Sequence, residues 1–252
     1  MSNTSFEEQL KQMDFFQSHP FLKPFIGENY TENEAGIRML LVGESHYVEN
    51  PLPQITRESL LNDWWSENPP LINDKNWYTT RGTIHNFMFG DSVRSYSLFR
   101  EPCKVYNDCF LHGKYQNTEE IRSLFDSFAY MNYFQMPALY ERISLWKSLL
   151  IFNNETNKVH PLSSEIWDKT EKISNEVFLS VAEILKPDKI VFLSTEAYNA
   201  FKRQNKTYDA DKIFATVHPT CAWWNREMKS GFTGKEALIN FFTSLASQRK
   251  SI

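Results

Sequence analysis

Three short segments combine side chains suited to chemistry with residues that favour turns. They are Gly43-Glu44-Ser45-His46-Tyr47, Met131-Asn132-Tyr133 and His218-Pro219-Thr220. A carboxylate such as Glu44 can orient water, the Asn132 amide offers one donor and one acceptor, and the His218 imidazole can donate a hydrogen bond. We therefore expect a ligand site where these segments meet.

Each segment lies at the end of a short apolar run that is typical of a buried parallel strand. The four runs of this kind are Ile37–Val42, Phe128–Tyr133, Lys189–Leu193 and Ile213–Val217. Ligands of open α/β sheets bind beyond the carboxyl ends of the strands, where the turns carry free backbone groups. All three segments should therefore lie at one edge of the sheet.

Helical patterns alternate with these runs, which predicts a parallel sheet. Apolar residues recur at helical spacing over 173–185 and stop before Lys186-Pro187. A hydroxyl of Ser194-Thr195 can cap a helix after the third strand, and Gly234–Ser247 has one apolar face. The stretch 48–124 is too long for an ordinary connection, and we interpret it as a partly helical excursion over the binding face.

Composition limits the classes of protein that fit. The 252 residues are 41% hydrophobic, enough for one core, so we expect a single domain over 1–252. A net charge of -4 argues against a strongly basic nucleic-acid binder. The sequence shows neither a secretory signal nor a run of the roughly 18 apolar residues that a membrane helix needs. Three cysteines form no metal or disulfide pattern, so we expect a cytoplasmic protein. We also expect a monomer that needs no metal or cofactor.

The order of the three segments resembles that of the uracil-DNA glycosylase superfamily. In that family one strand ends in Gly-Glu or Gly-Gln, a middle strand ends in Asn, and a last strand ends in His-Pro-Ser/Thr. The run Lys186–Leu193 is similar to the third strand of the family, so the likeness covers most of the chain. The resemblance implies a three-layer α/β/α sandwich around a four-stranded parallel sheet, and it implies excision of a uracil-like or deaminated base from DNA.

The resemblance also assigns roles to the residues. Gly43 to Tyr47 would match the turn that activates water, with Glu44 orienting the water and with Ser45, His46 and Tyr47 beside the ligand. Asn132 would read the edge of the base, and His218 would stabilise the departing base.

Further positions follow from the same likeness. The flipped base would stack on an aromatic residue, for which Tyr78 is the first candidate and Trp77 the second. Trp223 or Trp224 could fill the space that the base leaves, and Thr220 would contact phosphate.

One departure from the family pattern keeps a second function open. The best-known branch has an aspartate where this chain has Ser45, and serine is a far poorer base. The alternative is a protein that binds a nucleobase, a nucleotide or single-stranded nucleic acid on the same fold without cleaving it. A free nucleoside is a further ligand that would suit such a site.

Structural roles compete with several of these assignments. Glu44 could cap the helix that follows it, and Asn132 could close a turn through a backbone bond. Trp64 and Trp65 are interpreted as core residues beneath the excursion. A second His-Pro, at His160-Pro161, follows no strand, and we interpret it as part of a loop.

Overall fold

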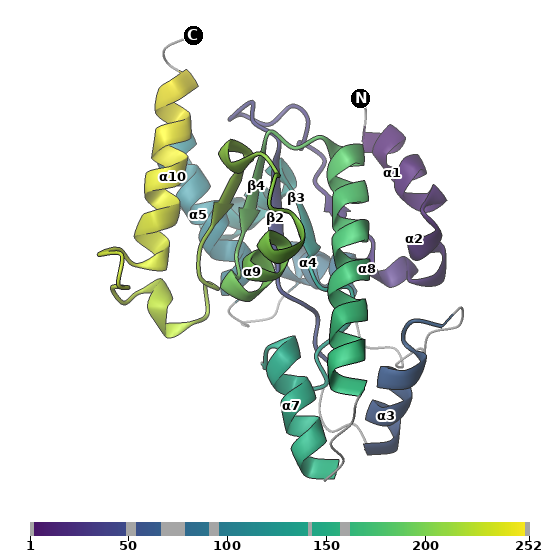
Figure 1. Ribbon diagram of the computed structural model, residues 1–252. Coiled ribbons are helices and arrows are strands. Elements are labelled where there is room, and N and C mark those ends of the chain that lie inside the picture. The colour runs from purple at the N-terminus through teal and green to yellow at the C-terminus, as the bar shows by residue number, and fades with distance from the viewer. Residues whose placement is uncertain are drawn as a thin grey trace.

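A computed structural model describes residues 3–48, 54–66, 79–90, 96–140, 143–156 and 162–249. At its centre is a five-stranded sheet in the order β1-β3-β2-β4-β5 (Figure 1). The strands are β1 (Phe25–Ile26), β2 (Met39–Gly43), β3 (Phe128–Asn132), β4 (Lys189–Phe192) and β5 (Ile213–Ala215). The last four run parallel to one another, and β1 runs antiparallel beside β3.

The predicted α/β class and the four predicted parallel strands are confirmed. The expectation of a purely parallel, four-stranded sheet is wrong at one edge. There Phe25 pairs with Tyr130 and Ile26 with Ala129, so β1 makes the sheet mixed. A strand of two residues is too short for an alternating pattern to reveal it in the sequence.

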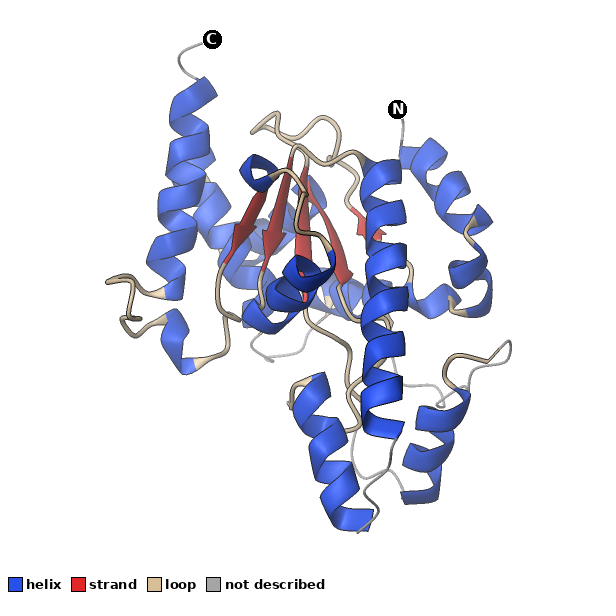
Figure 2. Cartoon of the chain, in the orientation of Figure 1, coloured by secondary structure: helices blue, strands red, loops and turns tan. Residues whose placement is uncertain are grey.

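Helices cover both faces of the sheet (Figure 2). The part of the chain that the structure describes contains ten α-helices: α1 (Asn3–Gln12), α2 (Asp14–Ser18), α3 (Gln54–Asp63), α4 (Thr80–Phe89), α5 (Ser97–Phe110), α6 (Thr118–Ser123), α7 (Leu145–Thr156), α8 (Leu162–Leu185), α9 (Thr195–Gln204) and α10 (Gly234–Arg249). None of the described helices has both the length and the apolar character that crossing a membrane requires.

Alternate residues of each parallel strand enter two separate hydrophobic clusters. Leu40 and Val42 of β2 pack with apolar residues of α1, α2, α8 and α9. Met39 and Leu41 pack on the other face, with residues of α4, α5, α6 and α10. Burial on both faces explains why these strands are almost wholly apolar.

The helix ends that the sequence predicts are confirmed. Helix α8 ends at Leu185, and Lys186 then adopts a left-handed φ of 48°, as is common directly after a helix. The Ser194 hydroxyl caps α9 by accepting a hydrogen bond from the Ala197 amide. Helix α10 includes the predicted range Gly234–Ser247.

The excursion over 48–124 is partly helical, as expected, and carries α3, α4, α5 and α6. Trp64, directly after α3, is fully buried, and its indole N–H donates to the carbonyl of Gln135 at 2.9 Å. Trp65 is half-buried against the same cluster. The interpretation of this pair as core residues is therefore confirmed.

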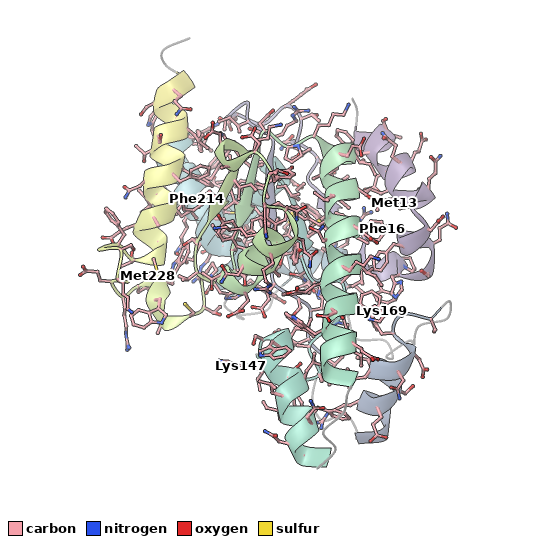
Figure 3. All side chains as sticks on the ribbon, viewed as in Figure 1. Met13, Phe16, Lys147, Lys169, Phe214 and Met228 are labelled. Atoms are coloured by element: carbon pink, nitrogen blue, oxygen red, sulfur yellow. The ribbon has the colours of Figure 1, made fainter. Side chains whose placement is uncertain are left out.

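Side chains fill the space between the sheet and its helices (Figure 3). Phe214 of β5 lies beneath α10, where its ring stacks on that of Phe241 with centroids 4.3 Å apart. This contact joins α10 to β5, the edge strand whose carboxyl end leads into the His-Pro segment.

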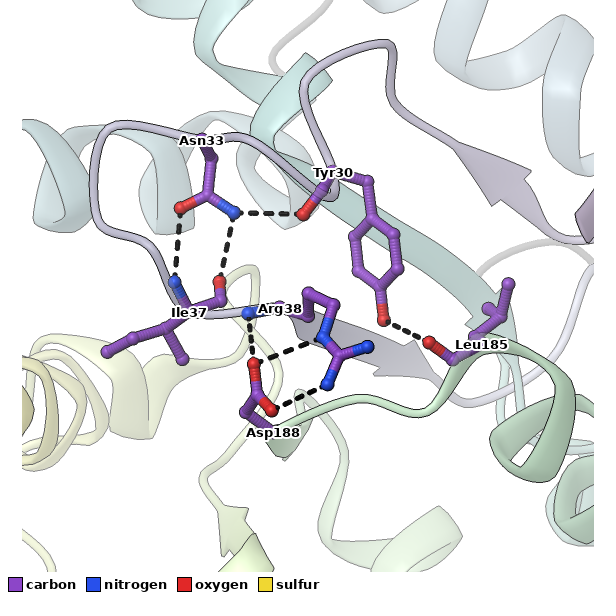
Figure 4. Close-up of polar contacts among 6 residues, drawn as sticks. All are labelled: Tyr30, Asn33, Ile37, Arg38, Leu185 and Asp188. Atoms are coloured by element: carbon purple, nitrogen blue, oxygen red, sulfur yellow. Dashed lines mark hydrogen bonds and ion pairs between the residues drawn. The ribbon is translucent and has the colours of Figure 1, made fainter. Parts of the chain in front are cut away.

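A polar network holds the amino ends of β2 and β4 together (Figure 4). Asp188 accepts hydrogen bonds from the backbone N–H, Nε and Nη2 of Arg38 at 2.8, 3.2 and 2.9 Å. Nearby, the Tyr30 hydroxyl donates to the carbonyl of Leu185, and Asn33 bonds both backbone groups of Ile37. The network lies at the edge opposite the predicted site.

Candidate functional site

A cleft of about 800 Å³ opens at the carboxyl edge of the sheet, toward which the arrows of the parallel strands point in Figure 2. Its walls come from the turn after β2, the end of β3, the loop after β5, the first turns of α4 and α5, and the residues before α7. Glu44, Asn132 and His218 all line it. The three predicted segments thus meet where open α/β sheets bind ligands.

Gly43 allows the first turn to approach β3 closely. A Cβ atom at this position would lie 2.1 Å from the Tyr130 hydroxyl and 2.3 Å from Oδ1 of Asn132, so any larger residue would force these side chains to shift. The carbonyls of Gly43 and Glu44 accept hydrogen bonds from the amides of Tyr133 and Phe134. The turn after β2 and the end of β3 therefore form one unit.

The Glu44 carboxylate is held at both oxygens. Oε1 accepts a hydrogen bond from the Leu145 amide at 3.3 Å, and Oε2 accepts one from the Ser194 hydroxyl at 3.2 Å. Leu145 begins α7, so Glu44 does cap a helix, although not the next one along the chain. Burial raises the pKa of Glu44 above its ordinary value, and the two hydrogen bonds only partly oppose that effect.

Asn132 is buried at the end of β3, with 6% of its surface exposed. Its Oδ1 accepts a hydrogen bond of 2.7 Å from the Tyr130 hydroxyl. The carbonyl of Asn132 accepts a bond from Gln135 Nε2, so the backbone at this point is also fixed. A side chain held in this way can present the rest of its amide to a ligand.

His218 is oriented by the residue two places after it. The Thr220 backbone N–H donates to Nδ1 of His218 at 3.2 Å, and the Thr220 hydroxyl lies 2.7 Å from the same nitrogen. A backbone amide can only donate, so Nδ1 carries the lone pair and Nε2 carries the proton. Burial lowers the pKa of His218 to about 4, which leaves the ring neutral at physiological pH.

The same contacts bear on the phosphate role predicted for Thr220. Its hydroxyl and its backbone N–H both point to His218 in this structure, so its observed contacts position the imidazole. Contact with phosphate stays a prediction.

The rest of the first turn also lines the cleft. His46 is buried, and its Nε2 lies 3.1 Å from the Thr80 hydroxyl, which donates its single proton to the carbonyl of Leu22. His46 must therefore donate from Nε2, which ties the turn to α4. Ser45 is half-buried in the cleft wall, and Tyr47 forms a parallel bridge with Ala138.

The predicted aromatic residues are distributed differently. Trp77 and Tyr78, and the second His-Pro at His160-Pro161, lie outside the described residues. Trp223 is 53% exposed beside the His-Pro segment and does not line the cleft. Trp224 is 1% exposed and belongs to the core, so its prediction as a surface wedge is wrong.

Several lining residues are absent from the sequence prediction. Tyr130, Thr80, Thr83, Tyr96, Ser97, Ser144 and Cys221 all contribute to the cleft wall. Two of them had a signal: residues two apart in a strand share a face, so Tyr130 must lie beside Asn132, and Cys221 directly follows the predicted His-Pro-Thr segment. The others come from helix starts and loops that no strand pattern could align with the site.

The cleft is polar but carries little charge. Among the described residues that line it, Glu44 is the one carboxylate and none is lysine or arginine. Within the described part of the chain, no group of three histidine, cysteine or acidic residues is arranged to hold a metal ion. Burial raises the pKa of Cys103 and of Cys109, as expected for packing thiols.

The site is therefore a polar cleft, with no lysine or arginine in its described lining, that joins a half-buried carboxylate, a held amide and an oriented imidazole. In comparisons with known proteins, no protein-family model, no curated protein and no solved structure matches this chain.

Proposed function

We propose that this chain hydrolyses the N-glycosidic bond of a uracil-like or deaminated base in DNA. The observation that carries the proposal is the presence of Glu44, Asn132 and His218 in one cleft, with the proton of His218 fixed on Nε2. The same residues carry the resemblance to the uracil-DNA glycosylase superfamily. A fold of that family is therefore part of the proposal.

His218 would stabilise the departing base. As the bond between the sugar C1′ and the base nitrogen breaks, its electron pair leaves with the base and negative charge develops on the base oxygens. A hydrogen bond from Nε2–H of His218 to one of these oxygens would stabilise that charge. Because burial keeps the pKa of the ring near 4, His218 would act as a neutral donor and not as a cation.

Glu44 would orient the attacking water. The water oxygen bonds C1′, its proton passes to the Glu44 carboxylate, and the released base takes a proton from solvent. The raised pKa of Glu44 brings its proton affinity closer to that of an effective general base. The bonds from Leu145 and Ser194 occupy one lone pair on each oxygen, which leaves others for water.

The charge and size of the cleft favour a base as the ligand. A neutral heterocycle needs hydrogen bonds and no counter-ion, and the described lining supplies hydroxyls, an amide and imidazoles without a cation. A volume of about 800 Å³ exceeds that of one base, so the attached sugar would enter the cleft as well.

A binding protein without catalytic activity is the second candidate. Ser45 stands where an aspartate would be a better base, and both oxygens of Glu44 already accept hydrogen bonds from the protein. In that case the cleft would recognise a nucleobase, a nucleotide or single-stranded nucleic acid and leave the glycosidic bond intact.

Base excision tests the proposal. Purified protein in excess would be incubated with single- and double-stranded oligonucleotides that carry one uracil, hypoxanthine or xanthine, and abasic sites would be cleaved with alkali. We expect product from at least one substrate, and we expect His218→Ala, Asn132→Ala and Glu44→Gln to reduce it by about 100-fold or more.

Matched controls use residues of the same types outside the cleft. His85→Ala, Asn154→Ala and Glu183→Gln change exposed side chains of α4, α7 and α8 and should leave excision unchanged. No abasic product from any substrate would reject the enzyme, and binding of the same oligonucleotides would then support the second candidate.

A further inference from the structure

Tyr130 and Asn132 form a buried pair inside the cleft wall. They lie two residues apart on one face of β3, with 2% and 6% of their surfaces exposed. The Tyr130 ring packs edge-on against Phe99, with centroids 5.1 Å apart, and is tilted against Phe125. The ring is thus held in place, and its hydroxyl donates to Oδ1 of Asn132 at 2.7 Å.

The direction of this hydrogen bond fixes the orientation of the Asn132 amide. The bond to Oδ1 is the one hydrogen bond that the Tyr130 hydroxyl makes to the described residues, and in the reverse orientation Nδ2 would face the tyrosine oxygen and the buried proton would lose this acceptor. A buried donor without a partner is costly, so Oδ1 faces Tyr130. Burial also raises the pKa of Tyr130, so the proton stays on the hydroxyl.

The remaining donor of the amide is then directed to the cleft. Nδ2 of Asn132 makes no hydrogen bond to any part of the protein that the structure describes, and Asn132 lines the cleft. Gly43 is required for this arrangement, because a Cβ atom there would overlap both the hydroxyl and Oδ1.

We propose that Tyr130 is a positioning residue that fixes Nδ2–H of Asn132 toward the ligand, so that the cleft selects a base with a carbonyl at that point. This inference rests on the proposed function. Uracil, hypoxanthine and xanthine carry a carbonyl where cytosine and adenine carry an amino group. An amino group would place two donors against each other and leave both without an acceptor.

Selectivity between two nucleosides tests the role of Tyr130. Dissociation constants for uridine and cytidine would be measured by calorimetry with wild type, Tyr130→Phe and Tyr133→Phe. Tyr133→Phe is the matched control, because Tyr133 follows directly after β3, its hydroxyl bonds Asn175, and it does not line the cleft. We expect wild type and Tyr133→Phe to prefer uridine by at least about tenfold, and Tyr130→Phe to retain a preference below about threefold.

The outcomes separate the two proposals. If wild type prefers uridine, Asn132→Ala loses the preference and Tyr130→Phe keeps it, then Tyr130 does not position the amide while the proposed function stands. If wild type binds neither nucleoside and excises no base, the proposed function fails and this inference fails with it.

A measurement on the wild-type protein tests the same assignment without depending on the folding of a variant. In nuclear magnetic resonance spectra, the Asn132 Nδ2 protons should form one resolved pair that shifts when uridine is added. The Tyr130 hydroxyl should exchange slowly with solvent. A rapidly exchanging hydroxyl, or an Asn132 amide that does not respond to bound uridine, would overturn the assignment.

Discussion

At the scale of single residues, one backbone contact sets the chemistry of His218. The Thr220 amide donates to Nδ1, so the neutral ring carries its proton on Nε2. Burial keeps that neutral form stable down to a pKa of about 4. The residue can therefore donate a hydrogen bond over the whole physiological pH range.

The lowered pKa of His218 predicts a pH dependence of stability. The unfolded chain binds a proton at this histidine near pH 6.5, whereas the folded chain does so only near pH 4. Between these values the unfolded state holds more protons, so stability must fall as the pH is lowered from 6.5 to 4. When the pH is lowered from 7.5 to 5, we expect the free energy of unfolding of wild type to fall by about 2 kcal/mol more than that of His218→Gln.

Urea unfolding of the two proteins at both pH values measures this difference. The raised pKa of Glu44 acts in the opposite direction, but it is common to both proteins and cancels in the comparison. An equal fall in the free energy of unfolding of wild type and variant would show that the fold does not keep His218 neutral.

Gly43→Ala tests the close approach of the first turn to β3. The new Cβ atom would lie 2.1 Å from the Tyr130 hydroxyl, so the pair must shift, and we expect a loss of about 1–3 kcal/mol in the free energy of unfolding. Urea unfolding measures it, with Ser45→Ala in the same turn as control. A loss no greater than that of Ser45→Ala would contradict the packing described for this turn.

The sequence predicted the principal residues of the site but not the contacts that orient them. Glu44, Asn132 and His218 follow strand ends, and the carboxyl ends of parallel strands must meet at one edge. The bonds from Leu145 and Ser194 to Glu44 join residues about 100 or more positions apart in the chain. No local pattern reports such contacts.

At the scale of elements, the parallel strands are tied together at their amino ends. Burial alone would raise the pKa of Asp188, but the hydrogen bonds and the charge of Arg38 lower it overall. Both side chains are partly exposed, which limits the contribution of the pair to stability.

Asp188→Asn should lower the free energy of unfolding by about 1 kcal/mol, because the charge is lost and the bonds to Arg38 weaken. Lys114→Ala removes the surface ion pair with Glu34, whose side chains are 54% and 51% exposed, and should cause no measurable change. Chemical denaturation compares the two. Equal effects would show that the Asp188 bonds do not join β2 to β4 in solution.

The elements themselves were predictable in proportion to their length and regularity. The four parallel strands, the end of α8 and the starts of α9 and α10 follow from apolar runs, a proline and a capping hydroxyl. Strand β1 was not predictable, since two residues carry no period. Helices α4 and α5 were expected only as parts of an excursion, because their apolar faces meet the sheet through distant contacts.

At the scale of the whole molecule, the charge distribution predicts how salt acts on binding. The chain has a net charge of -4, and the described lining of the cleft has no lysine or arginine. A protein that contacts 6–10 phosphates loses roughly 10³–10⁵ in affinity between 50 and 200 mM salt. We expect the affinity for a uracil-containing oligonucleotide to fall by less than about tenfold over this range.

Fluorescence anisotropy at several salt concentrations measures how the affinity for the oligonucleotide depends on salt. A loss of several orders of magnitude would mean that phosphate contacts dominate binding and that the cleft is not the main site of recognition.

The most direct test of the central claim observes the His218 imidazole while a ligand enters the cleft. Nitrogen nuclear magnetic resonance at pH 7 would record both ring nitrogens during a titration with uridine. We predict a neutral ring with its proton on Nε2 and an Nε2 signal that shifts as uridine binds. The Nδ1 signal should stay unchanged, because this nitrogen continues to accept the hydrogen bond from Thr220. A ring protonated at pH 7, or one that uridine leaves unchanged, would contradict the account.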